Sequence, residues 1–85
     1  MIGCLEELQA RIAYADKRYG CFASTHEALG VAAEEWDELR GAIHLGAIEA
    51  TREEALDLAA ALIRLADAIR SPAVDALSMR ARSVK

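Results

Sequence analysis

The sequence predicts an all-α domain: an antiparallel helical hairpin as the core, flanking short helices, and a bundle completed by oligomerisation. Apolar residues recur every three or four positions in three segments, and no segment alternates apolar and polar residues as a strand does. The chain is rich in alanine, the residue with the highest helix propensity, and contains a single proline. At 85 residues it has room for one core, so residues 1–85 are expected to form a single domain.

The first helix is expected from about Cys4 to Tyr19. Gly20 is expected to end it, because glycine readily adopts the conformations that follow the last turn of a helix. The apolar stripe of this helix consists of Leu5, Leu8, Ile12 and Ala15.

The second helix is expected from about Thr25 to Leu45. Ser24 and Glu27, three residues apart, fit a capping box in which each side chain accepts a hydrogen bond from the other residue's backbone N–H. Gly46 is expected to end the helix. Its apolar stripe consists of Leu29, Ala32, Trp36, Leu39 and Ile43.

The third helix is expected to begin at the segment TREE, where Thr51 and Glu54 fit a second capping box, and to continue to about Arg70. The Ser-Pro dipeptide at 71–72 ends it and can open a fourth short helix, because proline is tolerated at the first helical position. The connection formed by residues 46–50 is short, so the second and third helices should pack as an antiparallel hairpin.

The third helix carries more apolar surface than so short a chain can cover. Its large apolar residues are Leu56, Leu58, Leu62, Ile63, Leu65 and Ile69. Uncovered apolar surface of this extent favours association. We therefore expect a homodimer or homotetramer whose interface involves the second and third helices.

The charge balance is acidic, with 14 Asp and Glu residues against 10 Lys and Arg residues and a net charge of −4. This balance argues against nucleic acid as a partner, because coating it requires a basic field. Basic residues gather near the C-terminus, at Arg80, Arg82 and Lys85, where they can form a solvated tail or contact a triphosphate.

No signal peptide is expected, because the start of the chain has no basic segment followed by an apolar run. No stretch has the length of a membrane span, so no membrane partner is expected either. Cys4 and Cys21 do not form a CxxC pattern and are expected to be reduced thiols. Together these features predict a cytoplasmic protein.

Acidic residues within the expected hairpin are the candidate functional groups. Glu54 and Asp57 are three residues apart and project from one face of the third helix. The second helix offers two alternative pairs, Glu34 with Asp37 or Glu35 with Glu38. Four converging carboxylates repel one another unless a divalent cation lies among them, and oxygen ligands select a hard ion such as Mg²⁺ or Mn²⁺.

An alternative interpretation needs no metal: the acids of the second helix form a solvated face, and Glu54 serves only as a cap. Asp57 favours the site, because neither alternative explains one acid flanked by Leu56 and Leu58. Asp57 itself has two possible roles. It can be a metal ligand in an apolar shell, or a structural acid paired with an arginine such as Arg64 or one from another subunit.

The segment EEWDEL, followed after a short connection by EEALDLAAALIRLAD, resembles the ExxE and ExxD motifs of the MazG-like all-α nucleoside triphosphate pyrophosphohydrolases. The segment STHEAL is similar to small phage-borne members, and the likeness covers roughly residues 24 to 70. The resemblance selects the second acid pair. The implied metal site consists of Glu35, Glu38, Glu54 and Asp57.

The resemblance implies a Mg²⁺-dependent hydrolase, with Mn²⁺ as a possible substitute, that converts a (d)NTP and water into a (d)NMP and pyrophosphate. Such an activity removes surplus nucleotides from the pool. Glu35 or Glu38 would act as the general base on a water molecule. The candidates for contacting the substrate are Trp36, Lys17, Arg18, Arg64 and His26. The alternative is a catalytically inactive helical module for oligomerisation or binding on the same scaffold.

Overall fold

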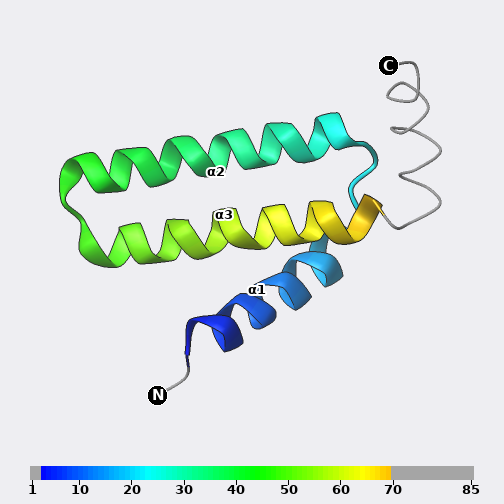
Figure 1. Cartoon of the computed structure of the whole chain (residues 1–85), viewed down its shortest axis with the longest axis horizontal. Helices are drawn as coiled ribbons and strands as arrows, with labels where there is room; N and C mark the ends of the chain where they lie inside the picture. Colours follow the sequence, from blue (N-terminus) through cyan, green and yellow to red (C-terminus); the bar gives the residue numbers. More distant parts are fainter. Residues whose placement is uncertain (1–2, 70–85) are drawn as a thin grey trace.

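The computed structural model describes residues 3–69, which form three helices (Figure 1). The helices are α1 (Cys4–Tyr19), α2 (Thr25–Leu45) and α3 (Ile48–Ile69). This part of the chain contains no strand, so the all-α prediction is confirmed for it. The fourth helix expected after Pro72, and the basic residues near the C-terminus, lie outside the described residues. None of the three helices combines the length and the apolar character needed to cross a bilayer.

The start of α2 follows the predicted cap with one difference. Ser24 Oγ accepts a hydrogen bond from the backbone N–H of Glu27 at 3.1 Å. The carboxylate of Glu27 accepts from the backbone N–H of Ala23 at 2.6 Å, one residue earlier than a capping box requires. Two backbone donors at this helix start are therefore satisfied by side chains.

The start of α3 differs from the prediction, because Thr51 is not a cap. Gly46 adopts the left-handed conformation, with φ 69°, and the N–H of Ala47 donates to the carbonyl of Ala42 at 3.0 Å. This closure of α2 turns the chain so tightly that α3 begins at Ile48. The N–H of Thr51 donates to the carbonyl of Ala47 at 2.8 Å, which is the first i→i−4 bond of α3. Glu54 is consequently not a capping residue.

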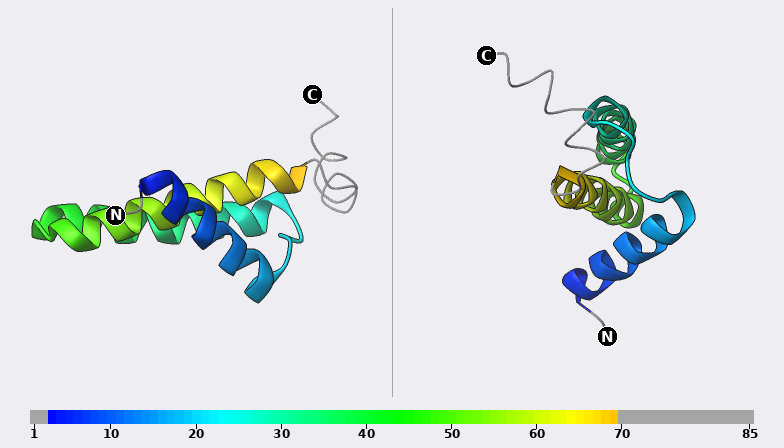
Figure 2. Two further views of the ribbon diagram at one scale, coloured as in Figure 1. Left: turned by 90° about the horizontal axis from the view of Figure 1, so that it is seen from below. Right: turned by 90° about the vertical axis from the view of Figure 1, so that its right-hand side faces the viewer.

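α2 and α3 lie side by side, and α1 packs on α3 (Figure 1). The end-on view of Figure 2 shows α1 crossing on one side of the α2–α3 pair. The side chains buried between the helices are mostly small. They are Phe22, Ala28, Ala42, Leu56, Ala60, Ala61 and Ala68. Alanines allow the two long helices to approach closely but bury little apolar area each.

Charged groups and partly covered apolar residues together hold α1 against α3. No residue of α1 is buried, although Leu8, Ile12 and Ala15 of its predicted stripe are partly covered. Ion pairs join the two helices at three levels along α1. The pairs are Glu7 with Arg52, Arg11 with Glu53 and Asp57, and Asp16 with Arg64. The position of α1 therefore depends on charge as much as on apolar packing.

Candidate functional site

Three carboxylates converge between α2 and α3. Each of Glu35, Glu38 and Glu54 offers an oxygen, and these oxygens all lie within 4.8 Å of one another. Glu35 and Glu38 are three residues apart and therefore project from one side of α2. We call these three residues the acidic triad. The other possible pair does not take part: the Asp37 side chain is 72% exposed and pairs with Arg40 at 3.4 Å.

The acidic triad contains polar atoms without partners. One carboxylate oxygen of Glu35 and one of Glu54 are buried and accept no hydrogen bond within the described residues. Burial raises the pKa of Glu35 to about 7, with the negative charges of Glu38 and Asp57 as further causes. Burial also raises the pKa of Glu54, again assisted by Glu38. Near neutral pH the triad therefore takes up a proton or a cation more readily than ordinary carboxylates do.

Asp57 lies beside the acidic triad but does not join it. Arg11 donates to the carboxylate of Asp57, to the carbonyl oxygen of Glu53 at 3.2 Å, and to the carboxylate of Glu53. The Asp57 side chain is 40% exposed, so the expectation of a lone acid in an apolar shell is wrong. The alternative role, a structural acid paired with an arginine, agrees with the structure, but the arginine is Arg11 of α1 and neither Arg64 nor a residue of another subunit.

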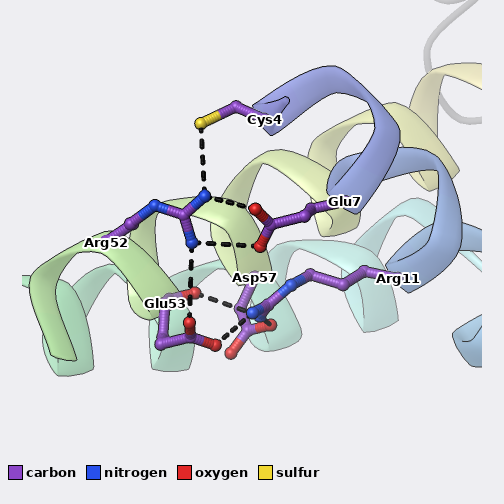
Figure 3. A network of polar contacts seen from close by, with 6 residues as sticks. All are labelled: Cys4, Glu7, Arg11, Arg52, Glu53 and Asp57. Atoms are coloured by element: carbon purple, nitrogen blue, oxygen red, sulfur yellow. Dashed lines mark hydrogen bonds and ion pairs between the residues drawn. The ribbon is translucent and has the colours of Figure 1, made fainter. Parts of the chain in front are cut away.

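Figure 3 shows how this contact belongs to a wider network between α1 and α3. Arg52 donates to both carboxylate oxygens of Glu7, approaches Cys4 Sγ at 3.7 Å, and lies 3.7 Å from Glu53. The hydrogen bonds from Arg52 lower the pKa of Glu7. The sequence analysis missed Arg11 and this network. A signal was present, because Glu7 and Arg11 are four residues apart and so lie on one face of α1.

An open groove of about 620 Å³ lies where α1 diverges from α2, with α3 between them. Its lining brings together acids, cations and aromatic rings. The charged lining residues are Arg11, Glu27, Glu34, Glu35, Asp57 and Arg64. The aromatic lining residues are Tyr14, Tyr19 and Phe22. The groove reaches the acidic triad through Glu35, and its volume lies in the range of small-molecule sites.

Arg64 is the predicted cation that does line the groove, but its side chain is buried and engaged. Its Nε donates to Asp16 at 2.9 Å, and one terminal nitrogen donates to the carbonyl oxygen of Gly20 at 2.7 Å. The guanidinium also lies 4.6 Å from the ring centroid of Phe22. These contacts fix the end of α1 against α3, so Arg64 has a structural role.

The other four predicted substrate contacts do not line the groove. Lys17 and Arg18 are exposed near the end of α1, where Arg18 lies over the Tyr19 ring at 5.6 Å. His26 is exposed in the first turn of α2. Trp36 is 52% exposed on α2, so the described residues do not bury the apolar stripe of α2 at this position.

Comparison with known proteins gives no assignment: no protein-family model, curated protein or solved structure matches this chain. The MazG-like resemblance therefore stays a hypothesis based on the acid pattern. The geometric facts that bear on it are the acidic triad, the position of Asp57 and the neighbouring groove.

Proposed function

We propose that the chain is a Mg²⁺-dependent nucleoside triphosphate pyrophosphohydrolase that converts a (d)NTP and water into a (d)NMP and pyrophosphate. The observation that carries the proposal is the acidic triad, in which Glu35 and Glu54 each hold a buried oxygen without a partner. The proposal includes the role in nucleotide-pool clean-up, the cytoplasmic setting and the homo-oligomeric assembly expected from the sequence.

The residues of the acidic triad fit a divalent cation. Two buried carboxylate oxygens without hydrogen-bond donors are the kind of group that a cation satisfies. All three side chains offer only oxygen, which suits Mg²⁺ and also Mn²⁺. Glu35, Glu38 and Glu54 would hold the ion, and Asp57 is within electrostatic range of Glu35. A bound divalent cation would offset phosphate charge and acidify a water molecule.

The chain's own groups divide the remaining tasks. Glu35 or Glu38 would act as the general base that removes a proton from the attacking water, and of the two Glu35 is the one that lines the groove. The groove beside Glu35 provides room for the nucleotide. Arg11 is the groove arginine that lies beside the acidic triad, because it pairs with Asp57, and it is the candidate for contacting phosphate. The products imply that the bond broken is the anhydride between the α- and β-phosphates.

A pyrophosphate-release assay with a panel of (d)NTPs and Mg²⁺ tests the proposal. Wild type should turn over at least one nucleotide, and Glu35→Gln and Glu54→Gln should abolish turnover. Asp37→Asn is the matched control, because Asp37 is an exposed acid of the same helix outside the triad. The control should retain wild-type activity. Absence of pyrophosphate from every nucleotide would contradict the proposed activity.

A second candidate function is a binding or oligomerisation module without catalysis. The contact between Arg11 and Asp57 favours it, because this arginine already neutralises the acid that the family motif assigns to the metal. Isothermal titration of (d)NTPs with Mg²⁺ separates the two candidates. Nucleotide binding without pyrophosphate release would support the module, and turnover that requires Glu35 would support the enzyme.

A further inference from the structure

A second face of the α2–α3 pair is apolar and is not covered by the described residues. On α2, three large apolar residues recur every seven positions: Leu29, Trp36 and Ile43, which are 64%, 52% and 55% exposed. On α3, three more follow multiples of seven: Ile48, Leu62 and Ile69, which are 77%, 47% and 37% exposed. Ala55, also exposed, fills the missing position of this repeat. We call these seven residues the apolar face.

The apolar face lies opposite the groove. Trp36 is two residues from Glu34, and Ala55 is two residues from Asp57, both of which line the groove. Two residues correspond to about 200° around an α-helix. On both helices, therefore, the seven-residue repeat lies on the side away from the groove residues Glu34 and Asp57.

The repeats on α2 and α3 are in register with each other. Glu54 of α3 converges with both Glu35 and Glu38 of α2, so position 54 is level with positions 36–37 of α2. Because the chain reverses direction between α2 and α3, Ala55 is then about level with Trp36, Ile48 with Ile43, and Leu62 with Leu29. The largest side chain of the face thus lies beside the smallest.

We propose that the apolar face binds a second copy of this chain through a two-fold axis parallel to the helices. That axis lays α2 of each copy over α3 of the other and places Trp36 over Ala55 of the partner subunit. Two-fold interfaces are self-complementary, and here a large side chain meets a small one twice. Neighbouring helices across the interface are antiparallel, an arrangement that their dipoles favour. The result is a four-helix bundle with seven-residue apolar repeats at its centre.

The apolar face offers surface that a second copy can cover. The six large residues of the apolar face expose between 37% and 77% of their surface. Stable interfaces take about 800 Å² from each partner, and the alanines and Thr51 between these residues contribute further surface.

The single tryptophan of the chain makes the inference measurable. Light scattering should give a dimer or a multiple of it at micromolar concentration. Dilution should shift the fluorescence of Trp36 to longer wavelength at the concentration where the mass falls. The inference specifies the homo-oligomeric assembly that the proposed function includes. Because its readouts are mass and fluorescence, its failure is distinguishable from an absence of pyrophosphate release.

Two charged substitutions test which residues meet. Trp36→Lys and Ala55→Glu should each give a folded monomer, because each homodimer would bury unpaired charges twice. An equimolar mixture should form a heterodimer, since one Lys–Glu pair and one native Trp–Ala contact replace the two native contacts. Leu5→Glu is the control: Leu5 is 75% exposed on α1, outside the face, and this variant should remain dimeric.

Helical content measured by circular dichroism identifies a variant that fails to fold. If Trp36→Lys or Ala55→Glu does not fold, Leu62→Glu takes its place as the test for a monomer. A monomeric wild type with solvent-exposed Trp36 fluorescence would overturn the inference. A monomer with protected fluorescence would assign the face to residues 70–85 of the same chain, and would overturn it as well. If wild type is dimeric but the equimolar mixture of the two variants stays monomeric, the pairing of Trp36 with Ala55 of the partner subunit is overturned.

Discussion

Replacing Glu35 by glutamine should stabilise the metal-free protein above neutral pH. One oxygen of Glu35 is buried without a partner, and Glu38 and Asp57 place negative charge nearby. Ionising Glu35 in this position costs free energy that the unfolded chain does not pay. Glutamine keeps the size of the side chain and removes the charge, so the penalty disappears.

The magnitude follows from the pKa of Glu35, about 7 in the folded protein against an ordinary 4.5. This difference corresponds to at most about 3 kcal/mol. Since Glu35 is partly exposed, solvent screening reduces the expected gain to about 1–2 kcal/mol. Below pH 4.5 the group is protonated in both states and contributes nothing. Between pH 4.5 and 7 the folded state binds more protons, so wild-type stability falls as pH rises, and the penalty is complete above pH 7.

Thermal and urea melts in chelator, at fixed protein concentration and at pH 5 and pH 8, measure the effect. Each kcal/mol corresponds to about 4–8 °C for a domain of this size. At pH 8 Glu35→Gln should melt above wild type, and at pH 5 the difference should shrink. Asp37→Asn, at an exposed position on the same helix, should show no such pH dependence. A Glu35→Gln protein less stable than wild type at pH 8 would refute the reasoning about the partnerless oxygen.

Three further predictions concern the acidic triad, the pair of Arg11 with Asp57, and the cap at Ser24. Millimolar Mg²⁺ or Mn²⁺ should raise the melting temperature of wild type, because binding to the native state stabilises it, and Glu54→Gln should lose the shift; equal shifts in both proteins would contradict a metal site at the triad. Asp57→Asn should lower metal-free stability by about 1–2 kcal/mol in chelator melts, because Arg11 loses a charged acceptor; a rise in stability would show that the charge of Asp57 costs more than its pairing contributes. Ser24→Ala should cost about 1 kcal/mol by urea melts, whereas Ser24→Asp, which keeps an acceptor for the N–H of Glu27, should cost little; equal losses would show that the cap hydrogen bond is not what stabilises this end of α2.

The helices could be predicted from the sequence where their boundaries depend on local chemistry. Gly20, Ser24 and Gly46 act within one turn of their own positions, and the bounds of α1 and α2 agree with the prediction. The start of α3 could not be predicted in this way. Thr51 and Glu54 have the spacing of a capping box, but the tight closure at Gly46 lets the helix begin earlier.

The candidate site, too, could be predicted only where it depends on spacing within a helix and on the short connection. Spacing on one helix placed Glu35 and Glu38 on one side of α2, and the short connection brought Glu54 opposite them. The partner of Asp57 depends on where α1 lies on α3, which is a tertiary contact between residues 46 positions apart. Helical periodicity places Glu7 and Arg11 on one face of α1, but it does not say which residues of α3 that face contacts, so the pairing of Arg11 with Asp57 could not be predicted.

The contact between Arg11 and Asp57 explains why a carboxylate occurs in the apolar stretch of α3. Asp57 lies near enough to raise the pKa of Glu35, and it also helps hold α1, which has no buried residue of its own. For Asp57 to become a fourth ligand of a cation, Arg11 must release it. Arg11 would still be paired with Glu53, and the Glu7 and Asp16 ion pairs would still join α1 to α3. Transfer of Asp57 from arginine to a cation therefore requires a local side-chain change and not the detachment of a helix.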